Sequence, residues 1–103
     1  MERNSSESLP DLFEQAKRLP QTPGVYVFRS LSGKPLYVGK AKRLRARVMQ
    51  YLNGHDSRPM IGRLVHEANQ IDVTLVSSER EALLVESGLI HKYRPRFNVR
   101  LVE

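Results

Sequence analysis

The chain has 103 residues, no cysteine, and 17 Lys and Arg against 11 Asp and Glu, which gives a formal net charge of +6. This length suits a single domain, and the lack of cysteine excludes a disulfide scaffold, a thiolate zinc site and a cysteine nucleophile. No apolar run approaches the roughly 20 residues that cross a bilayer, and the N-terminal sequence MERNSSESLP lacks the apolar stretch of a signal peptide. We therefore expect a cytoplasmic protein with a polyanionic partner.

The positive charge is concentrated in one segment. From Gln15 to His55 there are nine lysines and arginines and no acidic residue, whereas the rest of the chain holds eight basic and eleven acidic residues. This segment therefore carries the whole excess of positive charge. Such a one-signed stretch favours a nucleic-acid surface over an ordinary solvated face.

The first half of the chain predicts a helix, a hairpin and two more helices. Residues 1–9 are polar and are expected to form a flexible N-terminal segment, which leaves 10–103 as the single domain. A short helix is predicted over 10–19, because Pro10 suits a first turn and basic residues suit the last. Two short strands, 25–30 and 36–39, flank a Ser-Gly turn and predict a β-hairpin. The spacing of apolar residues then predicts helices over 41–52 and 58–69.

The second half predicts one strand and one helix. Residues 71–76 alternate between apolar and polar and are typical of a strand. Ser78, with Glu81 three residues later, is a capping-box pattern that opens a helix over 79–93, and Pro95 closes it. The expected fold class is α+β, with a small three-stranded antiparallel sheet flanked by helices in the order (α)ββααβα.

The hairpin has two chemically different faces. A turn over residues 31–34 pairs Phe28 with Tyr37 and Tyr26 with Gly39, which places the three aromatic rings on one face. The opposite face is aliphatic and consists of Val25, Val27, Leu36 and Val38. We expect the aliphatic face to be the core, so the aromatic face needs another explanation. The small Gly39 opposite Tyr26 leaves room for something to approach.

A stripe of cations follows the hairpin. Lys40, Arg43, Arg47 and Tyr51 recur at helical spacing in the predicted helix region, beside its apolar face, and no acid interrupts them. An arginine fork and a lysine point charge both suit phosphate oxygens. The alternative interpretation is a solvated helix face, which usually mixes charges of both signs.

One acidic residue is not explained by a helix end. Ala82, Glu86, Leu89 and Tyr93 share one stripe of the last predicted helix, so the carboxylate lies among apolar side chains. Buried without a partner, it would cost on the order of several kcal/mol. Glu86 must therefore be exposed, paired with an arginine or bound to a metal. Ligation by one carboxylate, waters and phosphate suits Mg²⁺.

Three sequence segments together resemble a known family. They are TPGVYVF, PLYVGKAKRLRARVMQYL and EREALLVESGLIHKYRPRFNVRL, which span about residues 19–101. Their order and spacing resemble the GIY-YIG endonucleases, in the branch formed by N-terminal domains of the excision-repair nuclease subunit UvrC. Departures are small: Gly88, His91 and Phe97 occupy positions where relatives often carry other residues, and none of them removes a proposed catalytic group.

The resemblance implies a role for each matching side chain. Glu86 is implied to be the single metal ligand, for one Mg²⁺ or Mn²⁺ ion. Lys42, Arg43 and Arg45, together with Lys40 and Arg47, are expected to bind the DNA backbone. The implied catalytic residues are Tyr26, Tyr37, Lys40, Arg47, Tyr51 and Asn98.

The implied reaction is metal-dependent hydrolysis of a DNA phosphodiester, with Tyr26 or Tyr37 as the general base. In nucleotide excision repair this would be the incision 3′ of a lesion, on damaged double-stranded DNA loaded with UvrB, with UvrB bound by parts of a longer protein. Two alternatives stay open. One is a standalone or exonuclease-fused nuclease of the same family, and the other is a non-catalytic nucleic-acid-binding module on this fold.

Overall fold

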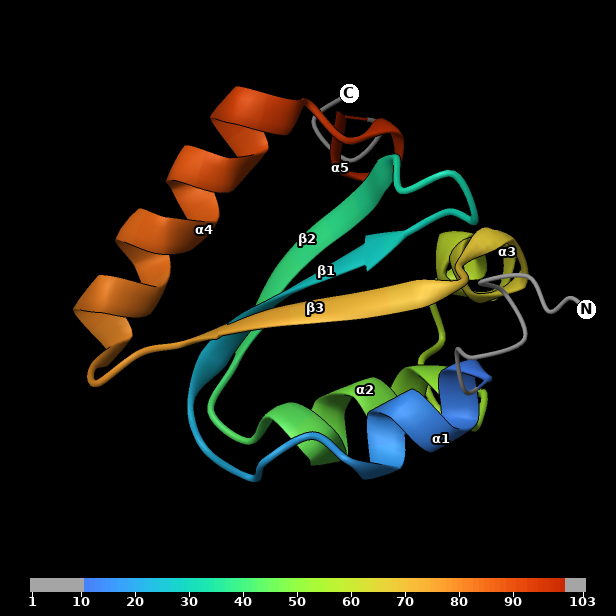
Figure 1. Ribbon diagram of the computed structural model, residues 1–103, viewed down its shortest axis with the longest axis horizontal. Helices are drawn as coiled ribbons and strands as arrows, with labels where there is room; N and C mark the ends of the chain where they lie inside the picture. Colours follow the sequence, from blue (N-terminus) through green and yellow to red (C-terminus); the bar gives the residue numbers. More distant parts are fainter. Residues whose placement is uncertain (1–10, 100–103) are drawn as a thin grey trace, which may run out of the picture.

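The computed structural model describes residues 11–99, so the flexible segment expected at 1–9 lies outside the described part of the chain. The described residues form five helices and three strands (Figure 1). In chain order they are α1 (Leu12–Lys17), β1 (Gly24–Arg29), β2 (Pro35–Ala41), α2 (Leu44–Leu52), α3 (Pro59–Glu67), β3 (Gln70–Leu75), α4 (Glu79–Tyr93) and α5 (Arg96–Val99). No helix among these is long and apolar enough to span a membrane.

The sheet has three strands in the order β2-β1-β3, with antiparallel pairing on both sides of β1. The predicted fold class is thus confirmed, and the hairpin register is too, since Tyr26 pairs with Gly39 and Phe28 with Tyr37. A bulge follows Phe28, so that Arg29 lies opposite Pro35. Helix α4 covers one side of the sheet, and α1 and α2 lie on the other (Figure 1).

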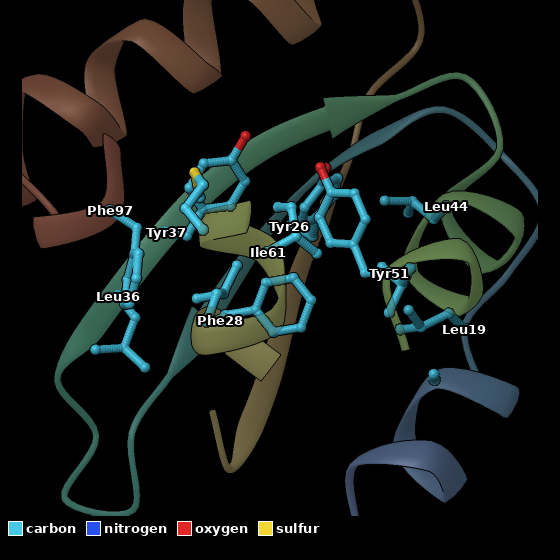
Figure 2. Packing of buried hydrophobic residues seen from close by; sticks show 13 residues of the cluster. Leu19, Tyr26, Phe28, Leu36, Tyr37, Leu44, Tyr51, Ile61 and Phe97 are labelled. Carbon is cyan, nitrogen blue, oxygen red and sulfur yellow. The ribbon is translucent and has the colours of Figure 1, made fainter. Parts of the chain in front are cut away.

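The main core lies on the aromatic face of the sheet, so the expectation that the aliphatic face forms the core was wrong in emphasis. Tyr26, Phe28 and Tyr37 pack there with apolar residues of α2, α3 and the segment after α4. Figure 2 shows this cluster, which also contains Leu36. A smaller cluster of Val25, Val27, Val38 and Ala82 joins the other face to α4. The aromatic face became the larger core because more helices pack on it.

The sequence suggested that the small Gly39 leaves room opposite Tyr26, and the structure shows that the Tyr26 ring occupies this room. A Cβ atom added to Gly39 would lie 2.5 Å from both Cζ and Oη of Tyr26. The phenol ring of Tyr26 itself therefore fills the space that the missing side chain leaves. The side chain of Tyr26 is only 1% exposed, so the close approach belongs to the packing of the hairpin.

Two helix starts differ from the sequence prediction. Asp11 caps α1 by accepting a hydrogen bond from the backbone N–H of Glu14 at 2.8 Å, so α1 begins at Leu12; Pro10 lies outside the described residues. The second helix was expected to start at Ala41, but β2 continues through that residue, because Gly24 at the start of β1 pairs with it. Lys40 is thus a strand residue, and the helical stripe begins only at the N-cap Arg43.

The last part of the chain holds a helix that the sequence pattern did not reveal. Helix α4 spans the predicted residues, and Ser78 accepts from the N–H of Glu81 as expected, but the Glu81 carboxylate accepts from Ser77 and not from the cap residue. Arg94 ends α4 in the left-handed conformation, with φ 46°. The short helix α5 follows and buries Phe97 in the main core. Four residues are too few to show helical periodicity.

Gly39→Ala should destabilise the protein, because the new methyl group must displace the Tyr26 ring. We expect a loss of roughly 1–3 kcal/mol in the free energy of unfolding, as for other overpacked cores. Gly62→Ala is the matched control, because nothing lies within 4 Å of the added Cβ in helix α3; there alanine should stabilise the helix by up to about 1 kcal/mol. Urea denaturation of both variants measures the difference, and equal stability of the two would contradict this packing.

Candidate active site

A cavity of about 520 Å³ opens where β1, β2, α2, the loop after α2 and α4 meet. Six of the seven side chains to which the resemblance gave catalytic or metal-binding roles line this cavity, although they come from distant parts of the chain. Its walls are formed by Tyr26, Tyr37, Gly39, Lys40, Arg47, Tyr51, His55, Asp56, Ser57, Arg58 and Glu86. Of the residues predicted to be catalytic, only Asn98 is outside this lining.

Three tyrosines form the floor of the cavity. The hydroxyl groups of Tyr26 and Tyr51 are hydrogen-bonded at 2.7 Å, and the ring of Tyr37 lies 6.4 Å from each of the other two rings, centroid to centroid. Figure 2 shows the hydroxyls of all three directed toward the same side, away from Phe28. Because the rings belong to the main core, the phenol groups are held in fixed positions at the bottom of the cavity.

Burial keeps these phenols protonated. Loss of solvent, and then repulsion from the Tyr51 phenol, raise the pKa of Tyr37 to about 12. The same two causes raise the pKa of Tyr26 further, and Arg47 opposes the shift only weakly. At neutral pH both groups are therefore hydrogen-bond donors in the protein without bound ligands.

Arg58 is a cation of the site that the sequence reasoning missed. Its Nη2 donates to the Tyr51 hydroxyl at 3.1 Å. Asp56 fixes the guanidinium from behind, accepting from Nε at 3.0 Å and from Nη2 at 3.1 Å. The sequence did offer a signal, since Arg58 follows the acidic Asp56 by two residues and precedes the Pro that starts a helix. However, Arg58 reaches Tyr51 only because this loop folds back onto α2.

Lys40 and Arg47 face the cavity from different elements. Lys40 is exposed on the outer strand β2, and Arg47 is exposed on α2. Among residues 11–99 neither side chain forms an ion pair or hydrogen bond with a protein group. Two guanidinium groups and one ammonium group thus surround the phenols, and two of them keep their full capacity to bind an anion.

Glu86 is the acidic group of α4 that reaches this cavity. The structure rules out the arginine ion pair that the sequence left open, since no described cation lies within salt-bridge distance of its carboxylate. Partial burial raises the pKa of Glu86, and the positive charge of Lys40 opposes that rise. Residues 11–99 contain no cluster of three His, Asp or Glu side chains that could hold a metal. The carboxylate oxygens of Glu86 are the kind of donor that a hard divalent cation prefers, and such a cation can keep most of its waters.

Asn98 lies beside the site and supports its wall. Its Oδ1 accepts from the backbone N–H of Val38 at 2.7 Å, and its Nδ2 donates to the carbonyl of Val38 at 2.9 Å. The amide thus pairs with the outer edge of β2 as a neighbouring strand would. It holds the strand segment between Tyr37 and Gly39, so its contact with the cavity is indirect.

Of the remaining predicted DNA-binding residues, Arg45 lies apart from Lys42 and Arg43. Arg45 is turned toward α1, where its Nε donates to the carbonyl of Leu19 at 2.8 Å. Lys42 lies near the start of α4, and its Nζ is 3.0 Å from a carboxylate oxygen of Glu79. Arg43 precedes α2 next to Lys42. Helical spacing alone could not separate these directions, because the strand continues through Ala41.

Known proteins match both the sequence and the fold. Residues 22–99 match the family model of the UvrC-like GIY-YIG domain. UvrABC system protein C of Thermotoga petrophila is 48% identical over 82 residues, which is 80% of this chain and 14% of that protein. The same protein of Protochlamydia amoebophila is 51% identical over 83 residues, again 80% of this chain and 14% of that protein. The chain thus spans only a small part of the length of these relatives.

A solved structure agrees with the fold over nearly its whole length. The crystal structure of the GIY-YIG N-terminal endonuclease domain of UvrC from Thermotoga maritima, bound to magnesium as its catalytic divalent cation, superposes with a TM-score of 0.76 at 38% identity. The match covers 86% of this chain and 98% of that one. Sequence, fold and the family model agree: the chain belongs to the UvrC-like GIY-YIG domain family.

Proposed function

We propose that this chain is a divalent-metal-dependent endonuclease domain that hydrolyses a DNA phosphodiester bond. The observation that carries the proposal is the cavity itself, in which an unpaired carboxylate, Glu86, faces two free cations and three phenols. Each group suits one need of phosphodiester hydrolysis: a metal ligand, anion binding and proton transfer. The related domain in the solved structure is described as an endonuclease bound to its catalytic cation.

Glu86 holds the divalent cation, Mg²⁺ or Mn²⁺, in this proposal. When bound, the cation supplies positive charge that stabilises the leaving 3′ oxygen of the cleaved bond. The half-buried carboxylate is kept ionised by that charge, and α4 fixes its position through the small cluster that joins the helix to Val38. Glu86 would be the protein ligand of that cation, since the other carboxylate that lines the cavity, Asp56, is bound to Arg58.

The cations of the site bind the scissile phosphate. Arg47 offers a planar pair of N–H groups to two phosphate oxygens, and Lys40 adds a point charge beside Glu86. As water attacks phosphorus and the bond to the 3′ oxygen breaks, negative charge builds on the phosphate oxygens, which strengthens both contacts. Arg58 is shared with Asp56 and orients the Tyr51 hydroxyl.

Tyr37 is the general base that takes the proton of the attacking water. The hydroxyl of Tyr26 is already bonded to Tyr51 and is almost fully buried. Tyr37 lines the same cavity, and its pKa, about 12, is raised less than that of Tyr26. The Tyr26–Tyr51 pair then serves to fix the floor beside the base.

The similarity to UvrABC system proteins supports a proposal for the biological role. We place the domain in a UvrABC-type excision-repair system, where it makes the incision 3′ of the damage on DNA loaded with UvrB. Segments of a longer protein would contact UvrB, because the chain covers 14% of such relatives. We expect such a repair activity to act in the cytoplasm.

Glu86→Gln should abolish nicking, because the amide keeps the shape of the side chain but loses the charge that holds the cation. We expect at least about a 100-fold slower relaxation of supercoiled plasmid with Mn²⁺ or Mg²⁺, since metal charge stabilisation contributes several kcal/mol to the barrier. DNA binding in EDTA should persist. Glu81→Gln on the same helix is the charge-matched control and should nick normally; wild-type nicking by Glu86→Gln would refute the metal assignment.

Tyr37→Phe should remove the pH dependence of nicking along with the activity. With a pKa near 12, the phenolate fraction of Tyr37 rises about tenfold for each pH unit between 7 and 9, so the wild-type rate should rise with a slope near one. The phenylalanine variant should be about 100-fold slower or more and lose this slope, whereas Tyr26→Phe should keep it. Single-turnover rates across pH measure this, and an unchanged slope in Tyr37→Phe contradicts the base.

A further inference from the structure

A second cavity lies next to the candidate active site. It has a volume of about 1270 Å³ and is formed by the end of β2, the first turns of α2 and the start of α4. Lys40 and Arg47 line both cavities, so the two are continuous along their shared wall. We call this second cavity the side groove. A strand whose phosphate sits at Arg47 would enter the side groove with its next nucleotides.

The walls of the side groove suit a nucleic-acid backbone. Five cations line it, from β2, the connection between β2 and α2, α2 itself and α4: Lys40, Lys42, Arg43, Arg47 and Arg80. Small apolar side chains such as Ala46 and Ala82 lie between them. The cations can bind the phosphates of a nucleic-acid backbone, and the apolar side chains between them can contact its sugars. Such contacts position a backbone without reading its sequence.

One acidic residue of the described chain lines the side groove. Glu79, in the first turn of α4, forms an ion pair with Lys42 across the groove, with Nζ and Oε2 3.0 Å apart. Both side chains are largely exposed, at 81% for Lys42 and 75% for Glu79. The lysine also lowers the pKa of Glu79. The pair joins the strand–helix connection to α4 at the point where a backbone would pass.

We propose that the side groove receives the DNA backbone next to the scissile phosphate, and that Glu79 limits DNA affinity by occupying Lys42. The inference rests on the proposed function, since it extends the same DNA from the active site. An exposed ion pair contributes little to stability in water, so a phosphate can take the place of Glu79 on Lys42. Because Glu79 competes with that phosphate for Lys42 and repels it, the wild-type chain loses most of this contact.

The test is the affinity of Glu79→Gln for DNA. Freeing one lysine for a phosphate contact adds about 0.9 to the slope of log K against log salt, which corresponds to about eightfold tighter binding at about 0.1 M salt. Fluorescence anisotropy with a labelled duplex in EDTA measures affinity without cleavage. Glu81→Gln is the control, because it removes the same charge two residues further along α4. The Glu81 carboxylate is hydrogen-bonded to Ser77 and forms no ion pair with Lys42. The DNA affinity of Glu81→Gln should rise much less than eightfold, because only the general loss of one negative charge acts there.

A double-mutant cycle with Lys42→Ala tests whether Glu79 acts on DNA affinity through Lys42. If Glu79 acts by occupying Lys42, the gain from Glu79→Gln disappears in the Lys42→Ala background. A gain that persists there, or one equalled by Glu81→Gln, overturns the inference. Plasmid nicking by the wild-type chain is measured in parallel. A wild-type chain that does not nick refutes the proposed function, whereas a chain that nicks but gains no affinity from Glu79→Gln refutes the side groove alone.

Discussion

The pairing of Tyr26 with Gly39 across β1 and β2 is the contact on which the site depends. Only a residue without a Cβ lets the Tyr26 ring approach β2 this closely, and in that position the Tyr26 hydroxyl is hydrogen-bonded to Tyr51. The same register sets Tyr37 opposite Phe28 on the same face. The floor of the cavity is therefore part of the hydrophobic core. This gives the phenol groups fixed positions, and the burial that fixes them also raises their pKa values.

The polar side chains around this floor belong to different elements, and a different contact holds each element in place. Glu86 is carried by α4, which packs on the opposite face of the sheet through Val25, Val27, Val38 and Ala82. Asn98 supplies the outer edge of β2 with the hydrogen bonds that a further strand would have made. Asp56 holds Arg58 against Tyr51. The side chains around the floor are thus each held by a different contact.

Lys40 lines both cavities and influences an acidic residue in each of them. From β2, its charge opposes the burial that raises the pKa of Glu86 in one cavity, and it adds to the effect of Lys42 in lowering the pKa of Glu79 in the other. The two carboxylates differ in their surroundings: Glu86 is half-buried and unpaired among residues 11–99, and Glu79 is exposed and paired with Lys42. The first environment favours a metal ion, and the second favours an exchangeable ion pair. Both acids thereby tune a surface that is otherwise cationic.

The sequence by itself determined the order of the main elements, the register of the hairpin and the unusual position of Glu86, because these depend on local periodicity, turn residues and charge patterns. It also indicated the family, since motif spacing is a property of the chain. It could not show that the aromatic face is the main core, that Lys40 belongs to a strand, that Arg45 turns to Leu19, or that Arg58 reaches Tyr51. Those outcomes depend on which segments pack together across long sequence separations. Only the tertiary structure decides them, because burial and pairing are set by neighbours that local sequence does not identify.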